Sequence, residues 1–528
     1  MEQQLYIGGK ILTMEKEEYA EALLVENGKI KAVGTQEELE AMGRGAECIR
    51  LHGAVVMPSF IDAHSHISGY AFSLMQASVE GAGSFSDIQA VIREFIRKNH
   101  IEKGKWIQVK GLDPTSLIEK CPPDKRILDE AAPENPVLLQ HQSGHTGVFN
   151  TMALRLLGVT AETPVPEGGR IVLENGEPTG YMEENAYLAY LQKLPVPTME
   201  ELEKNFQKAQ EIYASYGITT AQDGMVVGML ADIYRYLCSN KKLWLDIVGY
   251  ADFREKETLL KKLQAYMDGY KNHFRLGGYK IFLDGSPQAR TAWMRQPYEG
   301  EREYCGYPVL EDETVKEYVQ KALSEGRQLL AHCNGDAAAR QYIEAFETVL
   351  KGRPEAENIR PVMIHAQLLG RDQIEAVKRL RMIPSFFIGH VYYWGDAHIE
   401  NFGRDRAAHI SPAGSALRAG IPFTFHQDSP VTEPNMLESA WCAVARRTKS
   451  GVLLGEDERI SPMDALKAVT VYGAYQYFEE KEKGSIRPGK KADLVILDRD
   501  PAKIKTEEIR NIRILETIKD GEPIYGSV

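Results

Sequence analysis

The sequence has few cysteines, no long apolar run and no excess of basic residues. Six cysteines among 528 residues show no CxxC spacing, so we expect no disulfide framework. No stretch approaches 18 consecutive apolar residues, which excludes a membrane-spanning helix on sequence grounds. The 63 Lys and Arg residues against 75 Asp and Glu residues give a net charge of −12. We therefore expect neither nucleic acid nor a membrane as a partner.

The remaining composition is that of an ordinary globular protein. Apolar residues make up 43% and charged residues 26% of the chain. The first residues have neither the basic segment nor the apolar segment of an export signal. These features predict a reduced, cytoplasmic protein.

Both ends of the chain have the pattern of short β strands. Asn27-Gly28 separates two apolar runs, which is a strong hairpin signal, and residues 492–498 form a strand-like run near the other end. Two such pieces can complete one sheet, because neither can bury a face alone. We predict a small β-sandwich domain built from residues 1–53 and 480–528.

Between these ends, apolar strand-like runs alternate with helical patterns. Continuous apolar runs are typical of buried parallel strands, and eight strand–helix units close into a (β/α)₈, TIM-like barrel. The predicted barrel strands are 54–62, 218–223, 245–251, 279–284, 328–332, 361–365, 383–388 and 421–428. We therefore predict an α/β fold with a (β/α)₈ barrel over residues 54–479.

A long interval separates the first predicted barrel strand from the second. It contains expected helices at 85–97 and 199–216 and expected strands at 106–110 and 136–141. A structureless loop of this length would be unusual in a compact domain. We predict an inserted subdomain over residues 70–215, approximately, covering the top of the barrel.

The first predicted barrel strand ends in a pattern that suits a metal ion. His64 and His66 lie on one strand face with Asp62, because strand side chains alternate with period two. Two imidazoles at that spacing can bind one metal ion. A bare His-x-His pair is nevertheless more often a pair of ordinary histidines.

Later predicted strands strengthen the metal interpretation, because four of them carry a potential ligand near their ends: Lys280, His332, His365 and Asp428. In (β/α)₈ enzymes the carboxyl ends of the strands surround the active site. Charged residues at the ends of buried apolar strands are rarely without function. We predict that these side chains converge with the two histidines of the first strand.

Lys280 is an unusual member of this set, because a protonated ammonium group has no lone pair to offer a metal. It could be a buried lysine paired with Asp284 on the same strand face. Alternatively, its amine could form a carbamate with CO₂, whose two oxygens could bridge two ions roughly 3.5–4 Å apart. The sequence leaves both interpretations open.

The order of these residues resembles the amidohydrolase superfamily, and the local motifs resemble its third amidohydrolase family of metal-dependent hydrolases. The motifs lie at 58–66, 143–145, 180–186, 280–286 and 484–494, so the resemblance covers nearly the whole chain. One departure is His426-Gln427-Asp428, where many relatives have Gly-Ser-Asp. His426 could alter the pocket or supply an additional ligand.

The resemblance implies a divalent metal cofactor, with one or two ions per chain. We expect Zn²⁺, although Mn²⁺, Fe²⁺ or Co²⁺ would suit the same ligands. The implied ligands are His64, His66, Lys280 with a carboxylated Nζ, His332, His365 and Asp428. Asp428 would also be catalytic, accepting a proton from the attacking water and passing it to the leaving nitrogen.

Further candidates lie in the inserted subdomain and the later loops. His145 is expected to be a second catalytic residue that orients the substrate carbonyl, with His141 and Glu184 as substrate-binding residues. Arg290 and Arg406 could bind a substrate carboxylate, because guanidinium is a forked donor, or could form ordinary ion pairs.

Three histidines lie in or after the loop of the seventh predicted strand: His390, His398 and His409. At least one is expected to face the pocket.

We predict a metal-dependent amidohydrolase that cleaves a C–N bond other than a peptide bond in a small molecule, such as an N-acyl amine, a formamide or a cyclic amide. An ester, lactone or phosphoester substrate on the same site is an alternative, and so is a non-catalytic barrel that serves as a binding module. The presence of both Lys280 and Asp428 favours an enzyme. A homodimer is expected by analogy.

Overall fold

The structure is a computed structural model that describes residues 3–351 and 358–527. The chain divides into two compact units, each described here by itself. Unit 1 comprises Met1–Gly69 and Phe206–Val528, and unit 2 comprises Tyr70–Asn205.

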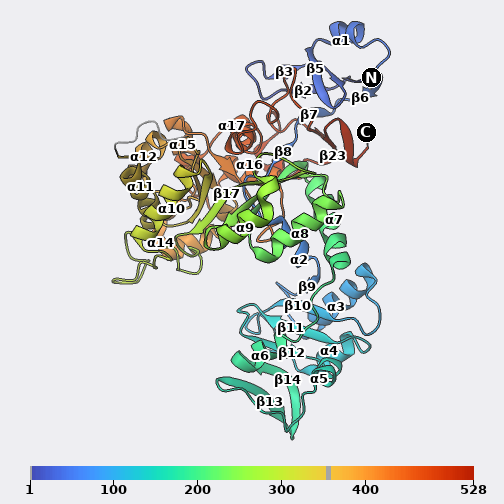
Figure 1. Cartoon of the computed structure of the whole chain (residues 1–528), viewed down its shortest axis with the longest axis vertical. Coiled ribbons are helices and arrows are strands. Elements are labelled where there is room, and N and C mark those ends of the chain that lie inside the picture. The colour runs from blue at the N-terminus through green and yellow to red at the C-terminus, as the bar shows by residue number, and fades with distance from the viewer. Residues whose placement is uncertain (1–2, 352–357, 528) are drawn as a thin grey trace. The chain divides into compact units, whose positions relative to one another are not determined.

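The centre of unit 1 is a sheet of eight parallel strands that follow one another in chain order (Figure 1). The strands are β8 (Phe60–Ile61), β15 (Ile218–Val226), β16 (Asp246–Asp252), β17 (Phe274–Phe282), β18 (Gln328–Cys333), β19 (Val362–His365), β20 (Ile383–Phe386) and β21 (Thr424–Phe425). His66 follows the first strand, β8, and Ser429 follows the last strand, β21. The His66 amide donates to the Ser429 carbonyl at 2.8 Å, so this hydrogen bond joins the two edges of the sheet. The curled sheet with its helices confirms the predicted TIM-like barrel.

Helices follow most of these strands. They are α8 (Gly228–Ser239), α9 (Lys256–Leu263), α10 (Asp312–Ser324), α11 (Asp336–Leu350), α12 (Ile374–Arg379), α13 (His390–Tyr393), α14 (Gly395–Ala408), α15 (Ala413–Ala419), α16 (Met436–Ala445), α17 (Pro462–Ala468) and α18 (Val471–Gln476). In α10, Val315, Val319 and Ala322 are buried at spacings of four and three residues, so one helix face packs inward. Acidic Asp312 and Glu313 in its first turn complement the helix dipole.

The predicted first barrel strand, 54–62, is two strands in the structure. β7 (Val55–Pro58) belongs to a sheet of the chain ends, and only β8 belongs to the barrel. The switch occurs at Ser59, whose amide donates to the Asp493 carbonyl, whereas the Phe60 amide donates to the Gly217 carbonyl. Both halves are buried and apolar, so the sequence pattern does not reveal the change of partner.

Two further sheets lie in unit 1. The sheet β5-β4-β1-β6 contains strands from the N-terminal end alone, and the sheet β24-β23-β22-β7-β2-β3 joins strands from both chain ends. Their elements are β1 (Gln3–Ile7), β2 (Lys10–Leu12), β3 (Tyr19–Ala20), β4 (Ala22–Glu26), β5 (Lys29–Gly34), α1 (Gln36–Met42), β6 (Glu47–Arg50), β22 (Leu494–Leu497), β23 (Ile514–Lys519) and β24 (Glu522–Gly526). Val25 and Val56 share one apolar core with Leu494, so the two sheets pack together. The boundaries of a separate domain, 1–53 and 480–528, stay a prediction.

The predicted Asn27-Gly28 turn joins β4 to β5. The φ angles are 51° at Asn27 and 74° at Gly28. A two-residue hairpin turn with positive φ at both positions matches the twist of the flanking strands.

Unit 2 is built on a sheet with the strand order β13-β14-β12-β11-β10-β9. Its elements are β9 (Gln76–Ser78), α3 (Phe85–Asn99), β10 (Ile107–Leu112), α4 (Lys125–Ala131), β11 (Val137–His141), β12 (Thr146–Phe149), α5 (Thr151–Leu157), β13 (Gly169–Glu174), β14 (Glu177–Glu183) and α6 (Glu184–Leu191). The helices α2 (Ile67–Ser73) and α7 (Met199–Ser215) cross the borders between the units. Ile88 and Ile92 of α3 pack with Val109 of β10. The expected helices and strands of the insertion are therefore present.

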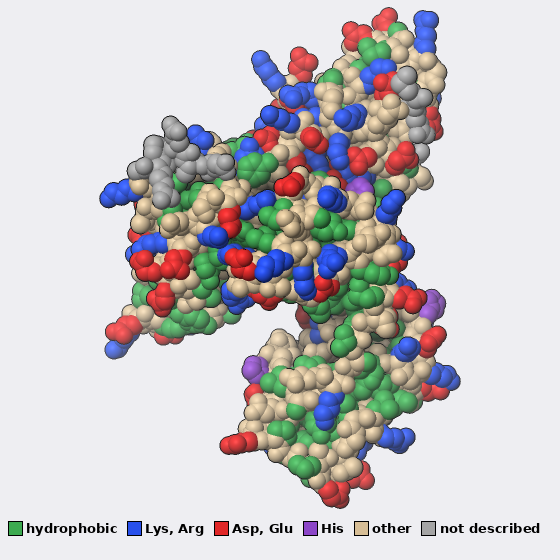
Figure 2. All heavy atoms as spheres, in the orientation of Figure 1, with side chains coloured by type: hydrophobic (Ala, Val, Ile, Leu, Met, Phe, Trp, Pro, Cys, Tyr) green, Lys and Arg blue, Asp and Glu red, His purple; other side chains and the backbone are tan. Residues whose placement is uncertain are grey.

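The surface carries charges of both signs. On the face of the described residues that Figure 2 shows, Lys and Arg side chains are interspersed with Asp and Glu side chains. Within residues 3–351 and 358–527, the helices are too short or too polar to span a bilayer.

Candidate metal centre

His64, His66 and Asp428 form a cluster at the carboxyl ends of the first and last barrel strands. One ligand atom of each lies within 4.8 Å of the others. Asp428 Oδ1 is 3.4 Å from His64 Nε2 and 3.6 Å from His66 Nε2. Two imidazole nitrogens and a carboxylate oxygen around a common point are suitable ligands for a divalent cation.

Two further predicted ligands, His365 and His332, lie beside this cluster. His365 Nε2 is 3.9 Å from Asp428 Oδ2, and the His365 ring is 5.8 Å from the ring of His64. The His332 ring is 4.6 Å from the ring of His365. The structure therefore brings all four predicted histidine ligands together with Asp428.

Three of these imidazoles are held in the neutral form, which is the form that binds metals. Burial lowers the pKa of His64 and of His365 well below the ordinary value, and it also lowers the pKa of His66. A neutral imidazole offers one nitrogen lone pair, whereas a protonated one offers none.

The backbone leaves the sheet at two of the ligand residues. His365 has a φ of 70° and Asp428 a φ of 53°. Residues other than glycine adopt this left-handed conformation in only a small share of cases. The strained turns follow β19 and β21 and aim these two side chains into the cluster.

Lys280 lies within β17 and is fully buried, with 1% of its surface exposed. Within the described part of the chain its Nζ has no hydrogen-bond partner. Burial lowers the pKa of Lys280 to about 7. A buried lysine without a partner is unusual, because an unpaired charge is costly in the protein interior.

Asp284, the alternative salt-bridge partner of Lys280, has other partners. Its carboxylate accepts hydrogen bonds from the amides of Trp293, Asn334 and Gly335 at 3.0, 2.9 and 2.7 Å. Its Oδ1 also lies 3.3 Å from His332 Nδ1. Asp284 thus lies beside a predicted metal ligand, and within the described residues it forms no ion pair with Lys280.

His426, the departure from the family motif, belongs to the same cluster. It is fully buried, and its ring is 5.1 Å from the ring of His64 and 5.2 Å from that of His365. Its Nε2 donates to the Ser385 carbonyl at 3.2 Å, so the lone pair lies on Nδ1. That Nδ1 has no hydrogen-bond partner among the described residues.

Gln222 is a site residue that the sequence analysis did not identify. It lies in β15, and its Oε1 is 2.5 Å from His64 Nδ1. The signal available in the sequence was a glutamine beside Asp223 in a predicted barrel strand, because buried polar groups need partners.

Three predicted site residues lie in unit 2. His145 Nδ1 is 3.0 Å from Glu184 Oε2, and the Glu184 amide donates to the His145 carbonyl at 2.8 Å. His141 Nδ1 is 2.8 Å from Ser143 Oγ. His145 and Glu184 thus form a pair, and their part in the reaction stays a prediction.

The two predicted arginines contact groups of unit 1 itself. Arg290 donates to the Glu299 carbonyl at 2.5 Å, and Arg406 donates to the Phe402 carbonyl at 2.8 Å. These bonds occupy part of each guanidinium group. Binding of a substrate carboxylate by either arginine stays a prediction.

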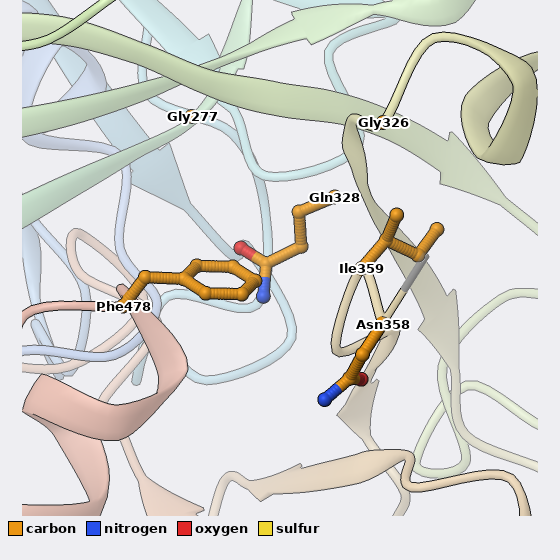
Figure 3. Close-up of a pocket in the computed structure, with 6 residues that line it drawn as sticks. All are labelled: Gly277, Gly326, Gln328, Asn358, Ile359 and Phe478. Carbon is orange, nitrogen blue, oxygen red and sulfur yellow. The ribbon is translucent and has the colours of Figure 1, made fainter. Parts of the chain in front are cut away.

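A hollow of about 420 Å³ lies at the opposite end of the barrel (Figure 3). It is lined by Gly277, Gly326, Gln328, Asn358, Ile359 and Phe478. Gln328 is the first residue of β18, whereas His332 is near the end of that strand. The hollow is therefore separate from the metal-ligand cluster.

The cluster fits a divalent ion by its donor set. It contains four imidazoles and a carboxylate, and Asp428 Oδ1 and Lys280 Nζ are buried without hydrogen-bond partners among the described residues. Buried polar atoms are normally hydrogen-bonded, so these atoms have capacity left for a ligand. The residues that could hold metal are His64, His66, Lys280, His332, His365 and Asp428.

The chain is similar to known proteins over its whole length. Residues 47–525 match the amidohydrolase family. The N-substituted formamide deformylase of Arthrobacter pascens is 29% identical, in an alignment covering 99% of this chain and 98% of that protein. YtcJ of Bacillus subtilis (strain 168) is 27% identical, with 99% of each chain covered.

Solved structures have the same architecture. An uncharacterized metal-dependent hydrolase from Pyrococcus horikoshii OT3 aligns with a TM-score of 0.76 at 25% identity, covering 96% of this chain and 99% of that one. Another, from Pyrococcus furiosus, aligns with a TM-score of 0.75 at 24% identity, and the alignment covers 95% of this chain and 100% of that one. The match to the family over residues 47–525 shows that this chain belongs to the amidohydrolase family.

Proposed function

We propose that this chain is a metal-dependent hydrolase that cleaves the C–N bond of an N-acyl amine, with N-substituted formamides as the preferred class. The observation that carries the proposal is the position of Asp428, whose Oδ1 is 3.4 Å from His64 Nε2 and 3.6 Å from His66 Nε2. A carboxylate there can both face a metal ion and reach a water molecule beside it.

The metal is proposed to be Zn²⁺, one or two ions per chain, because imidazole and oxygen ligands suit it. The proposed ligands are His64, His66, Lys280, His332, His365 and Asp428. When bound, a divalent ion polarises a substrate carbonyl and makes water a better nucleophile at neutral pH.

Lys280 is proposed to act as a carbamate. Its amine, whose pKa burial lowers to about 7, is partly uncharged at neutral pH. The uncharged nitrogen forms a bond to the carbon of CO₂ and releases one proton, which leaves a carboxylate on the side chain. An anionic group here would match a divalent ion, whereas the lysine ammonium group would repel it.

Asp428 is proposed to move the proton in the reaction. Its carboxylate accepts a proton from the attacking water and gives it to the nitrogen of the breaking C–N bond. The leaving amine needs this proton, since an amide anion is a poor leaving group. The side chain is 16% exposed, so water and substrate can reach it.

The preference for formamides is supported by the relative named N-substituted formamide deformylase, which aligns over 99% of this chain. His145, His141 and Glu184 of unit 2, together with Arg290 and Arg406, are proposed to contact the substrate. A cytoplasmic homodimer is proposed for the assembled enzyme.

A substrate screen tests this proposal. The full chain is treated with a chelator and reloaded separately with Zn²⁺, Mn²⁺ and Co²⁺. It is then assayed for release of free amine from N-substituted formamides, N-acyl amino acids and cyclic amides, and for release of acid from esters and lactones. We expect metal-dependent turnover of formamides. Turnover of esters or lactones alone would support the alternative hydrolase, and bound metal without turnover of any substrate would support a binding module.

A further inference from the structure

Two more buried histidines, His390 and His398, lie next to the metal-ligand cluster. His390 is the first residue of α13, four residues after the end of β20, and His398 lies in α14. Their exposed fractions are 4% and 0%. His390 Nδ1 is 3.0 Å from His398 Nε2, so the two imidazoles form a hydrogen-bonded pair.

One aromatic ring connects this pair to the cluster. The Phe387 ring is 4.8 Å from the ring of His390, 5.4 Å from that of His426 and 6.4 Å from that of His365. The Trp394 ring covers His390 from another side at 4.6 Å. Phe387 therefore contacts both His390 and two residues of the cluster, His426 and His365.

Both imidazoles of the pair are neutral. They are enclosed by aromatic rings, and burial lowers the pKa of His398 to about 3 and that of His390 well below its ordinary value. Each neutral ring carries one N–H group and one lone pair.

The surroundings of His398 determine which ring donates in the shared bond. Its Nδ1 is buried and has no hydrogen-bond partner among the described residues. If His390 were the donor, His398 would have to carry its own proton on Nδ1, as a buried N–H group without an acceptor. Orphaned buried N–H groups are rarer in proteins than buried acceptors without a donor. His390 Nε2, unlike His398 Nδ1, is not among the fully buried atoms without a partner, so a proton on it remains accessible. His398 Nε2 is therefore the donor, and His390 carries its proton on Nε2.

We propose that His390 offers its Nε2–H as a hydrogen-bond donor to the carbonyl oxygen of the substrate, and that His398 is the positioning residue that holds this tautomer. The inference rests on the proposed hydrolysis of an N-acyl amine. The bond to His398 uses Nδ1 of His390, and Nε2 is not among the fully buried atoms that lack a partner in the described residues, so this donor can meet a ligand. No proton is transferred and no bond is broken by this pair.

The donor would act where negative charge develops on the carbonyl oxygen as water attacks. A fixed donor in a dry site stabilises that charge without having to reorient during the reaction. The enclosure of His390 by Phe387 and Trp394 provides such a site.

Substitutions separate the two roles. We expect His390→Phe to lower kcat/KM by about 100-fold, as for loss of one oxyanion donor, with bound metal unchanged. His390→Gln keeps an N–H group at similar reach and should recover most of this loss. His398→Phe should lower kcat by about tenfold with little change in metal content, and His398→Gln should restore it because its amide can still donate to His390.

His409→Gln is the matched control. His409 follows α14, but its Nδ1 lies 3.1 Å from Glu458 Oε1, a structural pair. This variant should keep the wild-type kcat and KM. If the wild type hydrolyses a formamide and His390→Phe does so equally well, the inference is wrong while the proposed function stands.

Nitrogen NMR provides a test that does not depend on turnover or on the folding of a variant. In the full zinc-loaded chain with ¹⁵N-labelled histidine, long-range ¹H–¹⁵N correlations show which ring nitrogen carries the proton, and loss of signals in His390→Gln and His398→Gln assigns them. We expect the proton of His390 on Nε2. A proton on Nδ1 would overturn the inference even if no substrate were found.

Discussion

Gln222 Oε1 lies 2.5 Å from His64 Nδ1, and this contact determines which nitrogen of His64 is free. The amide nitrogen of Gln222 donates to the Ala63 carbonyl at 2.7 Å and to the Tyr477 hydroxyl at 3.0 Å. Tyr477 in turn donates its own proton to the Asp62 carbonyl, so it can only accept from Gln222. The orientation of the glutamine amide is therefore fixed.

With its oxygen facing His64, Gln222 must accept the proton of Nδ1. The lone pair of His64 then lies on Nε2, the nitrogen that faces Asp428 at 3.4 Å. Partners of this kind commonly set the tautomer of metal-binding histidines and raise their affinity.

The first prediction is that Gln222→Leu weakens metal binding by about 10- to 100-fold. The substitution removes the acceptor for Nδ1–H, so His64 is free to change its tautomer. Competition with a chromogenic chelator measures the affinity without any assay of activity.

Gln210→Leu is the control for loss of a buried glutamine. Gln210 is fully buried, and the hydrogen bonds of its side chain to the described residues go to backbone groups, among them the amides of Trp244 and Leu245. We expect a similar loss of thermal stability in both variants but weaker metal binding in Gln222→Leu alone. Equal metal affinity in the two would show that Gln222 is only structural.

The second prediction concerns Asp428. Asp428→Asn keeps an oxygen near His64 and His66 but cannot accept a proton as a carboxylate does. Turnover should fall by about 10²- to 10⁴-fold, the usual contribution of general acid–base catalysis, whereas metal content should fall much less. Elemental analysis and kinetics on the same preparation measure both quantities. Wild-type turnover by this variant would mean that the proton passes through another group.

The third prediction is that bicarbonate speeds the recovery of activity when metal is returned to chelated protein. Only the uncharged amine of Lys280 reacts with CO₂, and burial lowers its pKa to about 7. The cationic form is lost as the pH rises through this value, so about 10% of the amine is uncharged at pH 6 and about 90% at pH 8. The effect of bicarbonate should therefore be larger at pH 8.

Lys280→Arg is the control for this experiment, because a guanidinium group stays protonated at both pH values. It should show no effect of bicarbonate. The recovery rates with and without bicarbonate are compared at the same pH. Protonation of the histidines, which also affects metal binding, is then the same in both measurements. Equally fast recovery of the wild type in CO₂-free buffer would contradict the carbamate.

The sequence was most informative where one residue type and one spacing carry the chemistry. The period-two spacing of His64 and His66 placed both on one strand face, and the barrel brings His365 and Asp428 to the same end. Parallel strands in a closed sheet end at one rim, so ligands far apart in sequence converge once the barrel is predicted.

The sequence did not predict the contacts of residues whose partners lie in distant loops or strands. The local sequence does not show whether Asp284 lies beside His332 or beside Lys280. Its position is determined by the amides of Trp293 and Gly335, which come from later loops. The partner change at Ser59 is likewise decided by Asp493, more than 400 residues away. Such choices follow from tertiary contacts and not from local pattern.

The fourth prediction concerns a buried ion cluster between the barrel and the terminal sheet. Asp246 Oδ2 lies 2.7 Å from Lys483 Nζ and 2.9 Å from Lys519 Nζ, and all three side chains are buried. Burial alone would raise the pKa of Asp246, but the two ammonium groups outweigh it and hold the pKa well below its ordinary value. Asp246→Asn should destabilise unit 1 by up to about 3–5 kcal/mol, because it removes the carboxylate that both buried lysines share and leaves Lys483 with Glu479 and Lys519 with Asp493 and Asp520.

The pH dependence follows from the lowered pKa. A carboxyl group with a lowered folded-state pKa contributes its full stability above its unfolded pKa of about 3.9 and loses it as the pH falls toward the folded value. Urea titrations should thus show a constant difference between wild type and Asp246→Asn from pH 6 to 8, and a shrinking difference below about pH 4. A difference under about 1 kcal/mol at pH 7 would contradict a stabilising role for this cluster.

The position of bound metal tests the central claim most directly. Crystals of the zinc-loaded chain, measured on both sides of the zinc absorption edge, locate the ion by its anomalous scattering. The account predicts a peak within bonding distance of His64 Nε2, His66 Nε2 and Asp428 Oδ1. A zinc peak elsewhere, or zinc-loaded crystals with no peak among these three side chains, would contradict it.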